Sequence, residues 1–445
     1  MPPIIGPYRT IEIAEGTRAP LYIIPFDKKG RCKAPRTRNR LIDSLEHEQY
    51  SHVFLFSHGW NNDWDAASGR YFDFASGFTK LRRELNLAVS DHYKPLLVGI
   101  FWPSTWLVSP WERAPEFAAP GPGSELSDLV SDWAAELPDA QVERFYRLTD
   151  SEWIDVDDAH ELAALVAPLL RADDEVGDSA EITAEELLRV WQSSPTAAEE
   201  RTVDDDDDSF GTVGESGGAP AAAGWADKLD PRKVLRMASV WQMKDRAGRI
   251  GAKGVSPLLF DILRSGDHSV HLIGHSYGGK VVLSATAYQE LPRAVESMLL
   301  LQPAVSRLCF AASVAGTERA GGYRLVLERV KQPIVTTFSE RDVALTKAFH
   351  LAVRRDSDLG EQRIASPGGP PSRYAALGGF GPGGLGGELQ TVAMRDPGEA
   401  YDELDDANLE VLALNGDLTI DGHGDISNPS TWWALLEQAR RAGSV

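Results

Sequence analysis

The chain has 445 residues, 42% of them hydrophobic, and a formal net charge of −21 at pH 7. Its longest apolar runs are far shorter than a membrane span, so stable membrane insertion is not expected. The negative charge would repel phosphate backbones, which argues against nucleic-acid binding. Two cysteines, Cys32 and Cys309, cannot form a disulfide framework, and the amino terminus lacks a signal-peptide pattern. We therefore expect a cytoplasmic globular protein.

The negative charge is concentrated in one part of the chain. Residues 105–230 carry 31 acidic and 7 basic residues, whereas the remainder has a balance of +3. We predict a main α/β domain formed by residues 1–104 and 231–445. Between its two parts lie an acidic, mainly helical insertion at 105–203 and a flexible linker at 204–230, which is rich in Asp, Gly and Ala.

The first part of the main domain alternates between strand and helix patterns. Apolar runs predict a strand at 21–25 and a buried strand at 53–56, with a helix near 41–45 between them. Apolar residues from Ala67 to Leu85 recur every three or four positions, which predicts an amphipathic helix. A second buried strand is expected at 96–101.

The insertion shows helical periodicity. Apolar residues at 126–137 and 162–170 keep helical spacing, and Pro168 is expected to kink or end the second of these helices. Residues 183–186 read Thr-Ala-Glu-Glu, a capping box that predicts the start of another helix. We therefore expect a small helical subdomain.

The second part of the main domain resumes the alternation. Asp230-Pro231 predicts the start of helical segments that continue to about residue 263. Three further strands are expected at 298–301, 334–338 and 409–414. A glycine-rich loop is expected at 360–387, and a final helix from Asn428 onwards. Strands that alternate with helices predict a doubly wound, mostly parallel sheet, whose sites gather at the carboxyl ends of the strands.

One short motif indicates chemistry. Gly274-His275-Ser276-Tyr277-Gly278 follows the apolar run 270–273 and precedes a helical pattern at 280–291. This strand, turn and helix context is that of a nucleophile elbow, in which a strained turn raises the serine hydroxyl clear of the sheet. Side chains in place of the two glycines would collide with neighbouring backbone. We therefore predict that Ser276 is a nucleophile.

A second motif fits an oxyanion hole. The strand at 53–56 ends in Ser57-His58-Gly59-Trp60. In acyl transfer, two backbone N–H groups usually bind the developing oxyanion, one following the nucleophile and one from a loop after an earlier strand. Tyr277 and Trp60 are the candidates. Gly59 would let the backbone approach closely, and His58 belongs to the same loop.

A serine nucleophile needs a base, and the base needs an acid that orients it. His423 lies in a glycine-flanked loop between the last strand and the last helix, where a base is expected. Asp342 follows the preceding strand at 334–338 and is the predicted acid, with Glu340 as the alternative. Asp421 and Asp425 are too close in sequence to His423 for that role but can shape its loop.

With these residues the chain resembles the α/β-hydrolase superfamily, in particular its serine esterases and lipases. The resemblance covers residues 50–104 and 230–440. It implies an α/β-hydrolase fold and cleavage of a small-molecule or lipid-like carboxylic ester through an acyl-enzyme, without a cofactor or a metal. Members often carry inserted caps, which makes residues 105–203 a candidate cap, although this insertion precedes the nucleophile strand and the commonest caps follow it.

Other functions remain open at this point. An amidase, thioesterase or acyltransferase would use the same residues, and a non-catalytic interaction protein can share the fold. Gly274, Gly279 and Lys280 also approach a P-loop pattern, but Val281 stands where a magnesium-binding Ser or Thr is required. Five tryptophans near two strand ends fit either packing or an apolar acyl pocket: Trp60, Trp64, Trp102, Trp106 and Trp111.

Overall fold

The structure is a computed structural model. It describes residues 5–14, 17–60, 62–87, 90, 92–104, 130–131, 133–151, 153–170, 183–185, 187–188, 231–314, 319–348 and 375–443. The predicted linker at 204–230, two of the five tryptophans (Trp106 and Trp111) and the first half of the glycine-rich segment lie outside these ranges.

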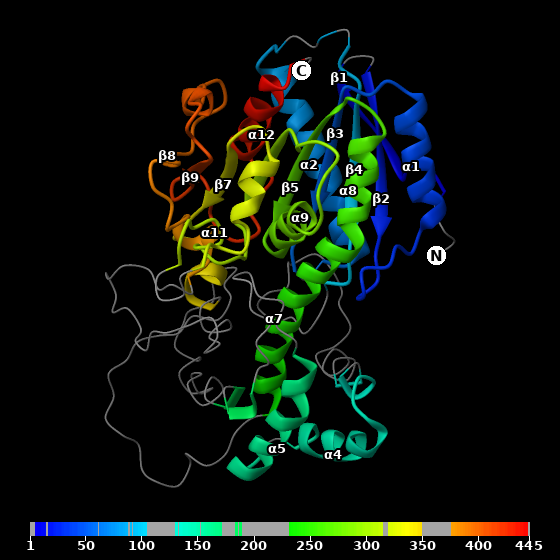
Figure 1. The fold of residues 1–445 in the computed structure, drawn as a ribbon, viewed down its shortest axis with the longest axis vertical. Coiled ribbons are helices and arrows are strands. Elements are labelled where there is room, and N and C mark those ends of the chain that lie inside the picture. Colours follow the sequence, from blue (N-terminus) through cyan, green and yellow to red (C-terminus); the bar gives the residue numbers. More distant parts are fainter. Residues whose placement is uncertain are drawn as a thin grey trace.

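A nine-stranded sheet forms the centre of the described chain (Figure 1). Its order is β1-β2-β4-β3-β5-β6-β7-β9-β8, and every neighbouring pair is parallel except β1 and β2. The strands are β1 (Arg9–Ala14), β2 (Thr17–Pro25), β3 (His52–Ser57), β4 (Pro95–Phe101), β5 (Ser269–His275), β6 (Ser297–Leu301), β7 (Ile334–Phe338), β8 (Leu389–Ala393) and β9 (Val411–Asn415). The prediction of an α/β protein with a mostly parallel sheet is confirmed.

Helices cover both faces of this sheet. Residues of α1 (Pro35–His47), α8 (Ser256–Arg264) and α9 (Tyr277–Ala287) share one hydrophobic core with one face. Residues of α2 (Trp64–Glu84) and α12 (Pro429–Arg441) share a second core with the opposite face. A central strand between two such layers is apolar at successive positions because both of its faces are buried. This explains the continuous apolar runs in the sequence.

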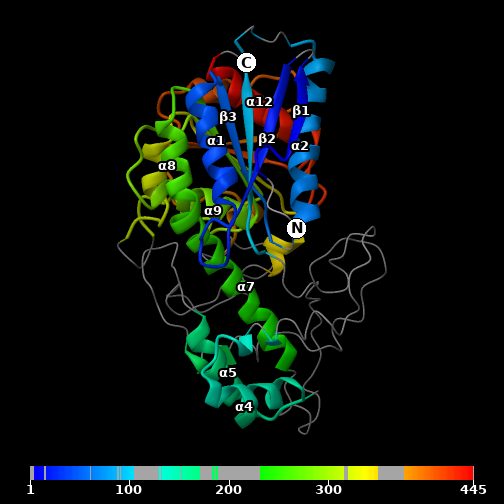
Figure 2. The ribbon, with the colours of Figure 1, turned by 90° about the vertical axis from the view of Figure 1, so that its right-hand side faces the viewer.

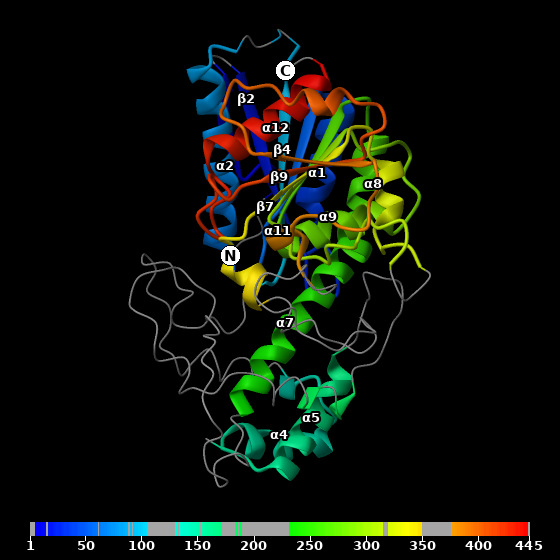
Figure 3. The ribbon, with the colours of Figure 1, turned by 90° about the vertical axis from the view of Figure 1, so that its left-hand side faces the viewer.

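One helix joins the insertion to the main domain. α7 (Pro231–Ile250) contributes Leu235 and Ala238 to a separate core that it shares with α4 (Asp139–Thr149) and α5 (Val156–Val166). Its second half belongs to the core of the main domain and continues through a π-helical turn, Gly251–Val255, into α8. Figures 2 and 3 show α4 and α5 at one end of α7 and the sheet at the other.

The helical pattern of the insertion is present where the structure describes it. α5 ends at Val166, just before Pro168, as predicted, and a short 3₁₀ turn covers Ala167–Leu169. α4 was not predicted. No helix of the described ranges is long and apolar enough to cross a membrane.

The prediction that all of 360–387 is loop is wrong in its described half, because α11 (Leu377–Phe380) lies within it. Gly378 packs so closely on the segment after β6 that an added Cβ would lie 2.3 Å from the Gln302 carbonyl carbon. Backbone hydrogen bonds from Leu377 to Val305 and from Gly378 to Pro303 hold this contact. The glycine here serves a close approach and not chain flexibility.

Candidate active site

Ser276 lies alone between a strand and a helix. β5 ends at His275 and α9 begins at Tyr277, and the serine between them has φ 54° and ψ −125°. Positive φ is rare for a non-glycine residue and persists only where surrounding contacts impose it. Here the Ser276 N–H donates to Leu301 O at 3.1 Å, and the Ser276 carbonyl accepts from the N–H groups of Gly279 and Ala304. The turn has the strained geometry expected of a nucleophile elbow.

The glycines around Ser276 allow backbone contacts that no other residue would permit. A Cβ on Gly278 would lie 2.1 Å from Ser57 O at the end of β3, and one on Gly274 would lie 2.6 Å from Gly279 Cα. A Cβ on Gly59 would lie 2.7 Å from Ser276 Cβ. The collision predicted for both elbow glycines is therefore present, and Gly59 brings the loop after β3 against the serine.

Three loops bring Ser276, His423 and Asp342 together. Ser276 Oγ is 2.8 Å from His423 Nε2, and His423 Nδ1 is 2.7 Å from Asp342 Oδ2. Asp342 is fully buried, and its other carboxylate oxygen accepts a hydrogen bond from the Leu345 N–H at 3.0 Å. A carboxylate accepts hydrogen bonds only, so Nδ1 carries the proton and the lone pair on Nε2 faces the serine hydroxyl. This is the tautomer that a general base needs.

The structure distinguishes the two candidate acids. Asp342 contacts the base, whereas Glu340 is exposed and its N–H donates to Asp417 Oδ1 at 2.7 Å. Asp421 and Asp425 do shape the base loop: Asp425 accepts from the Asp421 N–H at 3.1 Å and from the side-chain amide of Asn428, the N-cap residue of α12.

The two predicted oxyanion donors lie beside the nucleophile. Tyr277 is the first residue of α9, where backbone N–H groups have no partner within the helix. The ring centroid of Trp60 is 6.4 Å from that of Tyr277. Gly59 O accepts hydrogen bonds from His58 Nδ1 at 2.8 Å and from Asn62 Nδ2 at 3.2 Å. In a trans peptide the N–H points opposite to the carbonyl, so the Trp60 N–H points away from His58 and Asn62.

His58 holds this loop as a buried neutral side chain. The Trp102 N–H donates to His58 Nε2 at 3.2 Å, so the His58 proton is on Nδ1 and is donated to Gly59 O. The Trp102 indole stacks on the imidazole, and its Nε1–H donates to His58 O at 3.0 Å. Burial lowers the pKa of His58 to about 3. His58 is therefore a structural support of the loop and is not placed to be the base.

Three further polar residues near this loop were not predicted from the sequence. Asn62 Nδ2 donates to Trp60 O at 2.7 Å, and the Asn62 N–H donates to Ser104 Oγ at 3.0 Å. Arg70 Nε donates to Asn62 Oδ1 at 2.8 Å. These residues fix the carbonyl side of the oxyanion loop. Nothing in their spacing separates them from ordinary polar loop and helix residues.

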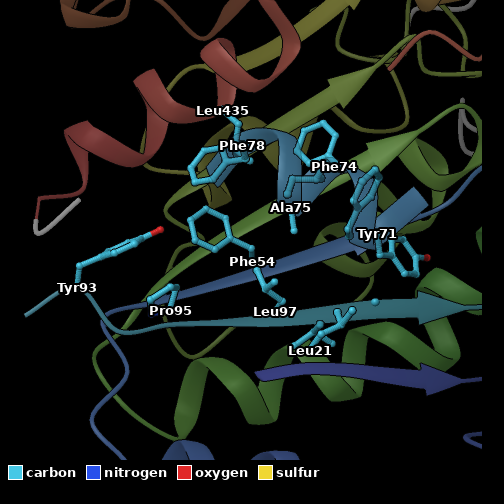
Figure 4. Close-up of a pocket in the computed structure, with 14 residues that line it drawn as sticks. Leu21, Phe54, Tyr71, Phe74, Ala75, Phe78, Tyr93, Pro95, Leu97 and Leu435 are labelled. Atoms are coloured by element: carbon cyan, nitrogen blue, oxygen red, sulfur yellow. The ribbon is translucent and has the colours of Figure 1, made fainter. Parts of the chain in front are cut away.

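The described tryptophans mainly serve packing. Trp102 is fully buried, and Trp64 makes edge contacts with Tyr8 and Phe101. Only Trp60 adjoins the candidate site. A separate apolar cavity of about 40 Å³ lies between the sheet and α2 (Figure 4). None of the three residues Ser276, His423 and Asp342 lines it, so it is separate from the candidate site.

The alternative of a P-loop fits the geometry less well. Lys280, the residue that suggested a P-loop, is 1% exposed, and its side chain packs toward α7, where a Cβ on Gly248 would lie 2.9 Å from Lys280 Cε. It does not reach out of the elbow toward a ligand. Among the residues that the structure describes, no group of three or more His, Cys, Asp or Glu could hold a metal ion.

Comparison of the chain with protein-family models, with curated proteins and with solved structures gave no match.

Proposed function

We propose that the protein is a serine hydrolase that cleaves carboxylic esters through an acyl-enzyme, on an α/β-hydrolase fold. One observation carries the proposal: Ser276 at positive φ, His423 and buried Asp342 form a continuous hydrogen-bonded chain with contacts of 2.8 and 2.7 Å. Nucleophile, base and orienting acid are the three parts that activation of a serine requires.

In the proposed reaction, Ser276 Oγ attacks the ester carbonyl and its proton passes to His423 Nε2. Asp342 stabilises the imidazolium that forms, and the N–H groups of Tyr277 and Trp60 bind the oxyanion. Collapse of the tetrahedral intermediate breaks the ester C–O bond, and the leaving alcohol takes the proton from His423. Water then repeats the sequence on the acyl-enzyme, which releases the acid and restores Ser276.

The fold assignment is supported by the position and order of these residues. Each follows the carboxyl end of a strand: Ser276 follows β5, Asp342 follows β7 and His423 follows β9. The order Ser, Asp, His along the chain and the strand-to-helix turn at the serine are those of α/β-hydrolases. Amidases, thioesterases and acyltransferases use the same three residues. Substrate assays therefore decide between ester hydrolysis and these reactions.

A covalent probe tests the proposal directly. A fluorophosphonate should label wild-type protein at Ser276, and labelling should be lost in Ser276→Ala, together with hydrolysis of a panel of nitrophenyl esters of increasing acyl length. Thioester and anilide analogues of the same acyl groups separate the related activities. Wild-type protein that is folded but neither labelled nor active on any of these compounds would contradict the proposal, and it would leave a non-catalytic binding role.

A further inference from the structure

The backbone of the candidate base is held by two buried side chains. His275 Nε2 lies 2.8 Å from the carbonyl oxygen of His423, and Gln302 Nε2 lies 2.9 Å from the carbonyl oxygen of Gly422. His275 precedes the nucleophile at the end of β5, and Gln302 follows β6, the neighbouring strand. Both side chains are at most 3% exposed. The base loop thus rests on two donors that come from the ends of adjacent strands.

The hydrogen-bonding state of His275 follows from its partner. A carbonyl oxygen only accepts, so His275 Nε2 carries the proton and Nδ1 carries a lone pair. Within the described chain Nδ1 has no hydrogen-bond partner, and it faces Gly59, where an added Cβ would lie 3.1 Å away. The rings of His275 and His423 lie 5.0 Å apart between centroids. Burial is the largest cause that holds the pKa of His275 well below its usual value, so it is a neutral donor.

Gln302 combines two costly features. Its φ is 37°, and its Oε1 is buried without a hydrogen-bond partner in the described chain. A buried carbonyl oxygen without a hydrogen-bond partner destabilises the folded state. Turning the amide over would place Oε1 against the carbonyl oxygens of Gly422 and His423, which cannot donate. The observed orientation therefore keeps the hydrogen bond from Nε2 to the base loop and leaves Oε1 unpaired. Positive φ and buried unpaired polar atoms are commonly found at functional sites.

We propose that His275 and Gln302 are positioning residues, which hold the His423 backbone so that its Nε2 stays in reach of Ser276; this inference rests on the proposed function. His275 and Ser276 are consecutive, and they contact His423 at its carbonyl oxygen and at its ring nitrogen, respectively. One rigid strand end thus fixes both ends of the base. Because a displacement of 1 Å can cost about 10²-fold in rate, the support acts on kcat through geometry.

The test compares variants with and without the hydrogen-bond donor at position 275. His275→Leu removes it, and His275→Gln supplies an amide N–H at similar reach. Gln302→Met removes the second donor while keeping much of the side-chain volume. His271→Leu is the matched control, because it removes a buried neutral histidine from the same strand without touching the base loop. The readouts are kcat and KM on the best nitrophenyl ester, the rate of fluorophosphonate labelling, and the downfield proton resonance of the His423–Asp342 hydrogen bond.

We expect His275→Leu to lower kcat and the labelling rate by about a hundredfold with little change in KM. His275→Gln should restore most of the loss, and Gln302→Met should give a smaller decrease in kcat. The downfield resonance should broaden in His275→Leu and persist in His271→Leu. If wild-type protein is labelled at Ser276 and His275→Leu is labelled equally fast, the inference is wrong and the proposed function stands. If wild-type protein is not labelled, both are overturned.

Discussion

Buried histidines lie in or next to both ends of the neighbouring strands β3 and β5, and the two ends differ. At the amino end, His52 and His271 form a closed chain: Ser297 Oγ donates to His271 Nδ1, His271 Nε2 to His52 Nδ1, and His52 Nε2 to Gly443 O, each contact between 2.8 and 2.9 Å. The direction follows from the terminal carbonyl, which only accepts. Every ring nitrogen has a partner, and burial lowers the pKa of His52 to about 4.

At the carboxyl end, the pairing is incomplete. His275 Nδ1 and Gln302 Oε1 have no partner in the described chain, and the His423 ring contacts the Ser276 hydroxyl. Of the three non-glycine residues with positive φ in the described ranges, two are Ser276 and Gln302. The presence of a buried histidine therefore does not by itself indicate a catalytic site. Of the four histidines His52, His271, His275 and His423, only His275 has a buried ring nitrogen without a partner in the described chain, and it adjoins Ser276 with its positive φ, at the end where chemistry is proposed.

The largest effects are expected at the three residues of the proposed triad. We expect His423→Ala to lower kcat by about 10⁶-fold and Asp342→Ala by about 10⁴-fold, as in other serine triads. Glu340→Ala is the matched control and should be nearly silent, because Glu340 is exposed and contacts Asp417 through its backbone only. Steady-state kinetics on one ester measure all three. A severe Glu340→Ala with a mild Asp342→Ala would reverse the assignment of the acid.

The close approach of the oxyanion loop gives the second prediction. In Gly59→Ala the new Cβ would collide with Ser276 Cβ at 2.7 Å, so the loop that carries Trp60 must shift. Loss of one oxyanion donor costs about 10²–10³-fold in kcat. Gly69→Ala in α2 is the control, since an added Cβ there meets nothing within 4 Å and should slightly stabilise the helix. Equal kcat values for the two variants would remove Trp60 from the proposed oxyanion hole.

These residues also show how far the sequence alone reaches. Ser276, Asp342 and His423 were predicted because the elbow is a local motif and chain order restricts its partners. The sequence gives no role to His275 or Gln302, because the role proposed for them depends on contacts with a loop 120 to 148 residues downstream. The strand β8 was missed as well: it is an edge strand of mixed polarity, without the apolar run of a central strand.

A substitution at the amino end of the sheet should lower the stability of the protein without lowering its catalytic rate. His52→Leu leaves the Nε2–H of His271 and the carbonyl oxygen of Gly443 without their partner. Gly443 is exposed, so water can replace the lost partner there, but the His271 Nε2–H is buried. A buried donor left without a partner costs on the order of 1–3 kcal/mol, so the free energy of unfolding should fall measurably in urea titrations. The kcat at a temperature where both proteins are folded should stay within about twofold, because Ser276, Asp342 and His423 all lie at the opposite end of the sheet. A decrease in kcat as large as that of His275→Leu would show that the two ends are coupled.

The effect confined to the narrowest range of conditions is expected in acid. Burial, and next the charge of Arg293, lower the pKa of His268, just before β5, to about 4. Above pH ~6.5 this imidazole is neutral in both the folded and the unfolded protein. Between about pH 6.5 and pH 4 it binds a proton in the unfolded chain but stays neutral in the folded protein, so the free energy of unfolding falls as the pH is lowered. Within this window His268 contributes about 1.4 kcal/mol per pH unit to the slope of unfolding free energy against pH. His268→Gln should reduce the slope by that amount and leave it unchanged above neutrality. Urea titrations at half-unit pH steps measure both slopes, and identical slopes in acid would mean that His268 is protonated in the folded protein.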